Sequence, residues 1–138
     1  IAKSSAYFVQ AFSRIGLIPD VGGTYFLPRA MGLAKAIGSS IFADKIMAAE
    51  AHEIGLIYEY IEDDDYDIHL KSRVEYLANG PTVAFAGIKD AMRKSLTNTL
   101  DEQLELEAKL QKKCGNTRDF QEGILAFHEK RDAKFEGR

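Results

Sequence analysis

The sequence predicts an α/β fold of at most one domain, with two short strands near its front and a helix-rich rear. Three observations support this prediction. The 138 residues are 46% apolar and 28% charged, a composition typical of a globular domain with a modest core. Residues 7–12 are apolar and aromatic, as expected for a short buried strand. The second half of the chain carries repeated helix start and stop signals.

A sharp loop follows the first predicted strand and leads into a helix. Residues 15–23 (IGLIPDVGG) contain Gly22 and Gly23, which permit positive φ. A helix is predicted to begin at residue 24 or 25. From residue 25, Pro28 falls within its first four residues, where the missing N–H would have no helical partner anyway. The loop is therefore predicted to open directly onto a helix N-terminus.

Two more helices and the second strand are predicted next. Gly32 ends the first helix, and residues 33–42 form another short one. Residues 48–54 are helical up to Gly55, and residues 56–61 form the second strand. An acidic turn follows, which could be a metal cluster, but neighbouring carboxylates before a helix are more typical of a solvated turn that favours the helix dipole. Its members are Glu62, Asp63, Asp64, Asp65 and Asp67.

The rear of the chain is predicted to hold four helices. Residues 67–78 form the first, and Pro81 opens the second. Thr99 and Glu102 have the spacing of a capping box for the third. Residues 117–131 form the fourth, with an apolar stripe along one face. These amphipathic helices carry more apolar surface than so short a chain can bury, so partner subunits are expected.

Composition limits the classes of function. The formal net charge of −3 gives no broad cationic surface for nucleic acid. No apolar run is long enough for a membrane span, and the single Cys114 cannot form an internal disulfide. A cytoplasmic protein that binds neither nucleic acid nor membrane is predicted. The three histidines and Cys114 lack metal-ligand spacing, so no metal site is expected.

Asp20 is the candidate for chemistry. It follows Pro19 and precedes Gly22 and Gly23, directly before a helix whose unpaired N–H groups favour negative charge. On this pattern alone a simple turn or cap carboxylate is the commoner role, since such proline, aspartate and glycine runs are ordinary turn chemistry.

Four stretches together resemble the crotonase superfamily. They are residues 12–29 (FSRIGLIPDVGGTYFLPR), 48–57 (AAEAHEIGLI), 104–108 (LELEA) and 119–131 (DFQEGILAFHEKR). The similarity covers essentially the whole chain and is greatest to the phenylacetate-pathway isomerase branch, which acts on ring-epoxidised phenylacetyl-CoA. It implies the C-terminal part of a crotonase ββα spiral fold, helix-rich with terminal trimerisation helices. Residues 1–80 would be the end of the spiral core with the active-site loop, and residues 81–138 the helical oligomerisation region.

The resemblance also implies a mechanism. Asp20 would be the catalytic carboxylate of an acyl-CoA isomerase, with Ile18, Pro19, Gly22 and Gly23 in its active-site loop. The residue four before Gly16, where several hydratases of the family carry a glutamate, is Phe12. Since a phenyl ring cannot activate water, isomerisation is favoured over hydration, either as a double-bond shift or as opening of a ring epoxide.

The coenzyme and the partners follow from the same resemblance. Phe127 and Lys130 would lie near the adenine and phosphate of coenzyme A, although on pattern alone they are a core residue and a solvated neighbour. Coenzyme A belongs to the substrate, so no cofactor is expected. The implied assembly is a homotrimer or dimer of trimers, with oxyanion donors in an N-terminal crotonase half that this chain does not contain. An enoyl-CoA hydratase, a hydrolase and a catalytically silent oligomerisation or binding fragment remain as alternatives.

Overall fold

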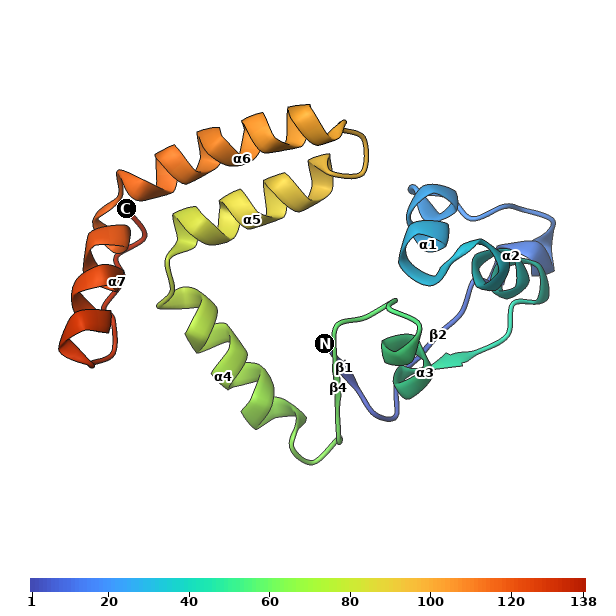
Figure 1. Ribbon diagram of the computed structural model, residues 1–138. Coiled ribbons are helices and arrows are strands. Elements are labelled where there is room, and N and C mark those ends of the chain that lie inside the picture. The colour runs from blue at the N-terminus through green and yellow to red at the C-terminus, as the bar shows by residue number, and fades with distance from the viewer. The chain divides into compact units, whose positions relative to one another are not determined.

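The computed structural model describes residues 1–138 and divides into two compact units, residues 1–71 and 72–138 (Figure 1). The boundary lies inside helix α4 (Tyr66–Ala78), whereas the expected division at residue 80 lies just after this helix. Each unit has its own packed elements.

The first unit contains two small sheets and three complete helices. Strand β1 (Ala2–Lys3) pairs in parallel with β4 (Tyr60–Ile61), and β2 (Tyr7–Phe8) pairs antiparallel with β3 (Ile46–Met47). Between these strands lie η1 (Ala11–Ile15), α1 (Gly23–Met31), α2 (Leu33–Phe42) and α3 (Ala48–Glu53). Each sheet has only two strands, so each strand has one edge without a strand partner.

The two strands predicted at residues 7–12 and 56–61 are each only two residues long in the structure. Of residues 7–12, only Tyr7–Phe8 is a strand, because the chain then turns into the 3₁₀ helix η1, which ends at Gly16 with φ +76°. Of residues 56–61, only Tyr60–Ile61 pairs. The N–H groups of Leu56 and Ile57 instead donate to the carbonyl of Ala51 and close the end of α3.

The helices of this unit follow their start and stop signals closely, with one exception. Helix α2 has the predicted bounds, and Gly32 ends α1 with φ +80°. Helix α1 begins at Gly23, however, so Pro28 lies inside the helix rather than in its first turn. Its absent N–H leaves the carbonyl of Thr24 without a helical partner, and the exposure of Thr24 lets water take that role.

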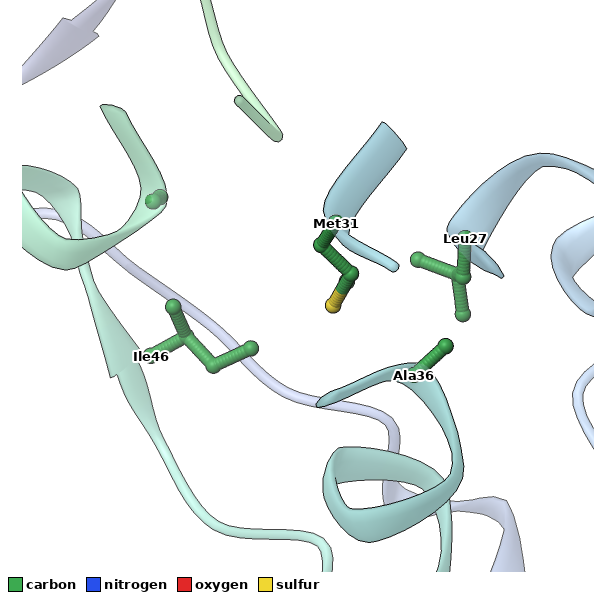
Figure 2. Close-up of a cluster of buried hydrophobic side chains, with 5 residues drawn as sticks. Leu27, Met31, Ala36 and Ile46 are labelled. Atoms are coloured by element: carbon green, nitrogen blue, oxygen red, sulfur yellow. The ribbon is translucent and has the colours of Figure 1, made fainter. Parts of the chain in front are cut away.

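A small apolar core holds the first unit together. Its buried members are Leu27, Met31, Ala36, Ile46 and Ala51. Figure 2 shows how Leu27 and Met31 of α1 lie near Ala36 of α2, with Ile46 of β3 on the other side of Met31. No large side chain in the chain is fully buried, and Leu33, Ile37 and Ile41 along α2 remain about half or more exposed.

The second unit is helical. Helix α5 (Thr82–Lys94) packs against α6 (Leu100–Gly115), which packs against α7 (Arg118–Glu129); α5 and α6 lie side by side (Figure 1). Pro81 is the N-cap of α5 rather than its first residue.

The capping box of α6 is confirmed. The Glu102 N–H donates to Thr99 Oγ1 at 3.4 Å, and the Thr99 N–H donates to the Glu102 carboxylate at 2.8 Å. The Thr99 hydroxyl also donates to this carboxylate, at 3.0 Å. The two hydrogen bonds that the carboxylate accepts, from the N–H and the hydroxyl of Thr99, hold the pKa of Glu102 below its ordinary value. Helix α7 ends two residues earlier than predicted because Lys130 turns left-handed at φ +53°.

Candidate active site

The loop before α1 is shaped by a tight turn at Asp20. The Gly23 N–H donates to the Asp20 carbonyl at 2.8 Å, and the two central residues, Val21 and Gly22, both have positive φ (49° and 82°). Two positive φ angles at the centre define a type I′ turn, in which glycine is favoured and a β-branched residue is strained. The turn therefore brings Asp20 to the N-terminal end of α1.

The Asp20 side chain lies on the surface while its neighbour anchors the loop. Pro19 is buried, and a Cβ atom on Gly23 would lie only 3.0 Å from the Pro19 Cβ atom. Helix α1 thus approaches the loop so closely at this point that only glycine fits without a shift. Asp20 is exposed and makes no side-chain hydrogen bond or ion pair, so its carboxylate is free to accept a proton from an added ligand.

An apolar cavity of about 300 Å³ lies beside this turn. The loop contributes Ile18 and Pro19, and α1 contributes its first residue, Gly23. Asp20 and Gly22 lie between these residues in the turn and are not part of the cavity wall. The remaining wall residues belong to α1 and α2: they are Thr24, Leu27, Pro28, Leu33, Ala36, Ile37, Ser40 and Ile41. A free carboxylate next to an apolar cavity suits proton transfer on a largely hydrocarbon substrate.

The α2 wall of this cavity was not predicted from the sequence. Leu33, Ile37 and Ile41 are spaced four residues apart, so they form one stripe along α2. This spacing in the sequence indicates an apolar helix face. Only the packing of α1 on α2 shows that this face borders the Asp20 loop.

Phe127 and Lys130 lie together at the end of α7, in the second unit. Phe127 is 81% exposed, and its ring centroid lies 6.0 Å from that of His128 in an edge arrangement. Lys130 is exposed, has no ion pair, and its backbone N–H donates to the carbonyl of Phe127 at 3.3 Å. Phe127 lines an apolar cavity of about 580 Å³, and Lys130 follows it by three residues at the helix end.

The acidic turn forms hydrogen bonds with Ser4 and Ser5, near the start of the chain. The Asp63 carboxylate accepts hydrogen bonds from the Ser5 N–H at 3.1 Å and from Ser5 Oγ at 2.6 Å, and these bonds lower the pKa of Asp63. The Glu62 carboxylate accepts from Ser4 Oγ at 2.9 Å.

The structure places no three histidine, cysteine, aspartate or glutamate side chains together as metal ligands. None of its helices is both long enough and apolar enough to span a bilayer.

Comparison with known proteins identifies the fold. A model of the enoyl-CoA hydratase/isomerase family matches residues 1–138. A probable enoyl-CoA hydratase of Rhodobacter capsulatus is 51% identical over the whole chain, which covers 54% of that protein. The 1,2-epoxyphenylacetyl-CoA isomerase of Escherichia coli is 42% identical over the whole chain, which covers 53% of it.

The solved structures agree with the sequence relatives. A crystal structure of an enoyl-CoA hydratase/isomerase from Mycobacterium abscessus superimposes with a TM-score of 0.92 at 34% identity, over 99% of this chain and 52% of the other. The helix-rich α/β fold expected from the resemblance is thereby confirmed. The chain spans about half the length of these relatives. The predicted placement of the chain in the C-terminal half is not supported, because the family match covers residues 1–138 without assigning them to that half.

Proposed function

The chain belongs to the enoyl-CoA hydratase/isomerase family, and we propose that it forms part of an acyl-CoA isomerase in which Asp20 transfers the proton. The observation that carries this proposal is the position of Asp20. Its unpaired carboxylate is held by a tight turn at a helix N-terminus, at the border of an apolar cavity.

One carboxylate suffices for isomerisation. Asp20 takes a proton from a carbon that the thioester acidifies and returns it to another position, which shifts a double bond or assists opening of a ring epoxide. The negative charge that develops on the thioester oxygen needs preorganised N–H donors, and losing one such donor typically costs about 10²–10³ in rate. We assign these donors to the remaining half of the full-length enzyme.

Phe12 favours isomerisation over hydration. It lies on η1, four residues before Gly16, where its phenyl ring has no group to hold or activate water. The names of the relatives do not separate the two activities, since one is called a probable hydratase and another an isomerase. A phenylacetyl-CoA type substrate agrees with the second of these relatives.

The coenzyme part of the substrate is assigned to the end of α7. The exposed ring of Phe127 offers a face for adenine, and the unpaired Lys130 ammonium suits a phosphate. We further propose a cytoplasmic homotrimer or dimer of trimers, because the exposed apolar side chains of the helices need partners. No cofactor takes part in this scheme besides the coenzyme A of the substrate itself.

The test is to supply the missing half and measure the products. This chain is combined with the polypeptide that completes a full-length relative, and turnover of enoyl-CoA and of ring-epoxide phenylacetyl-CoA is followed. Asp20→Asn is expected to lower isomerisation by about 10²–10⁴-fold, the usual contribution of a general acid or base. The matched control, Asp44→Asn, removes another exposed carboxylate of the same unit and should keep full turnover. Retained activity in Asp20→Asn refutes the assignment, and hydrated product supports a hydratase instead.

A silent assembly module is the second candidate. It is favoured by the many exposed large apolar side chains and by the absence of any fully buried large side chain, which leave much apolar surface for contact with partners. Stable oligomers that stay inactive with either substrate after the missing half is added would support this reading.

A further inference from the structure

The last eight residues form a strap, residues 131–138, that folds back along α7. Its main anchor is Asp119, which is only 3% exposed. One carboxylate oxygen of Asp119 accepts the Glu136 N–H at 2.7 Å, and the other accepts the Gly137 N–H at 3.0 Å. The Asp119 N–H in turn donates to the Arg138 carbonyl at 3.1 Å. Three hydrogen bonds thus join one residue of the helix N-terminus to the end of the strap.

A second anchor lies one turn further along α7. The Glu122 carboxylate makes a two-point pair with the Arg131 guanidinium, at 2.6 and 3.0 Å, and also accepts the Lys134 N–H at 2.8 Å. Backbone amides of an irregular segment need partners when they are shielded from water. Here the two carboxylates supply those partners in place of a helix or a sheet.

Gly137 fits its place for two separate reasons. Its φ is +75°, and a Cβ atom on it would lie 2.7 Å from Thr82 Oγ1 on α5. Any other residue would be strained and would also collide with the first residue of α5. The strap is therefore bonded to Asp119 of α7 and closely approaches Thr82 of α5.

The hydrogen bonds of the strap fix the position of Phe135. It lies between the Lys134 amide held by Glu122 and the Glu136 amide held by Asp119. A Cβ atom on Gly123 would be 3.7 Å from the Phe135 ring, so this ring packs directly over the glycine. Phe135 and Phe127 line the same cavity of about 580 Å³, one from the strap and one from α7.

We infer that Asp119 is a positioning residue: by fixing the strap, it holds Phe135 as a wall of the cavity that Phe127 lines, and so sets the affinity for the coenzyme. The inference rests on the proposed role of Phe127 in binding coenzyme A. Asp119 is itself one of the residues that line the cavity, but it acts through Phe135 rather than on the reacting carbon. A carboxylate is required because it accepts at both oxygens, whereas an amide would present a donor to one of the two N–H groups.

Two variants test the strap from opposite sides. Asp119→Asn keeps the shape of the side chain but sets an NH₂ group against a backbone N–H. Gly137→Ala leaves the carboxylate intact and pushes the strap away from Thr82. Asp132→Asn is the matched control, because it removes an exposed charge from the same segment without touching either anchor.

The first readout is hydrogen exchange of the Glu136 and Gly137 amides. Both variants should exchange at least about tenfold faster than the parent, as expected when hydrogen bonds to a charged group are lost. The second readout is turnover by the enzyme assembled with its missing half. We expect KM for the acyl-CoA to rise about tenfold while kcat stays within about twofold, because only binding is altered. Asp132→Asn should change neither quantity.

The contrary outcomes are distinct. Unchanged exchange in Asp119→Asn shows that the carboxylate does not hold the strap and overturns the inference. Faster exchange with unchanged KM overturns the link from strap to coenzyme, and Phe127→Ala then identifies the premise that failed. A raised KM in Phe127→Ala refutes the role of Asp119 alone, whereas an unchanged KM there refutes the coenzyme site at Phe127.

Discussion

Replacing Val21 by asparagine is expected to stabilise the chain by about 1 kcal/mol. Val21 occupies a left-handed position, at φ +49°, in the turn that presents Asp20. A residue with a branched Cβ atom in this region costs roughly 1–2 kcal/mol, and asparagine is among the few residues that visit it routinely. Because the Val21 side chain is 95% exposed, its removal sacrifices almost no buried apolar surface. Relief of backbone strain is therefore the dominant effect, and the substitution should increase the free energy of unfolding.

Thermal or denaturant unfolding followed by circular dichroism measures this change. For a chain of this size, 1 kcal/mol corresponds to a rise in Tm of about 3–4 °C. Ile18→Asn is the control, since Ile18 is a β-branched and exposed residue of the same loop but has no positive φ. It should leave stability unchanged or slightly lower it.

Either of two results would refute the reasoning. A Val21→Asn variant that unfolds earlier than the parent would mean that the valine is not strained in this turn. An equal gain from Ile18→Asn would mean that lower surface hydrophobicity, rather than backbone conformation, is responsible. Glycine at position 21 should gain less than asparagine, because it also adds freedom to the unfolded chain.

Two further predictions concern the second unit. Thr99→Ala should destabilise the chain by about 1 kcal/mol, because the N-cap of α6 is lost. This loss should be seen as a lower denaturant midpoint of unfolding and as faster amide exchange at Glu102. The control Thr97→Ala, outside the cap, should cost less than half as much. The second concerns pH, since hydrogen bonds from Arg131 lower the pKa of Glu122 to about 2. Its stabilising effect is present above pH 4.5, the ordinary value, and is lost as the pH falls from 4.5 through 2. The amide NMR signal of Lys134 should accordingly shift with a midpoint near 2, and a midpoint near 4.5 would contradict the paired geometry.

Features set by neighbouring residues were predictable from the sequence. The capping box of Thr99, the end of α1 at Gly32 and the bounds of α2 all depend on side chains within one turn. The order of helices in the second unit followed from the same local signals. Helix α1 is the exception, because it begins at Gly23, directly after the turn at Asp20, and so contains Pro28 in its interior.

Features that depend on distant partners were not predictable. A strand extends only as far as its neighbour allows, and β3 offers just two residues to β2, so most of the predicted strand at residues 7–12 has no ladder. The anchors of the strap were missed for the same reason. Asp119 bonds to residues 17 and 18 positions later, and no periodicity connects a helix N-terminus with an irregular segment at that distance.

The candidate site was predicted in part. Its turn follows from the local sequence between Pro19 and Gly23. The structure places Ile18, Pro19 and Gly23, the first residue of α1, in the wall of one cavity. The role of Asp20 in catalysis and the roles of Phe127 and Lys130 in coenzyme binding stay predictions. The Asp20→Asn variant tests the first of these roles, and Phe127→Ala tests the part of Phe127 in the second.

The free edges of the two small sheets bear on how the stability of this chain responds to an added polypeptide. Each edge of β1 and β4 presents backbone donors and acceptors that another strand can satisfy. Any polypeptide that adds a strand there binds the folded form and not the unfolded one, so it raises the unfolding midpoint by mass action. Melting temperatures measured on the chain alone should therefore climb as such a segment is titrated in.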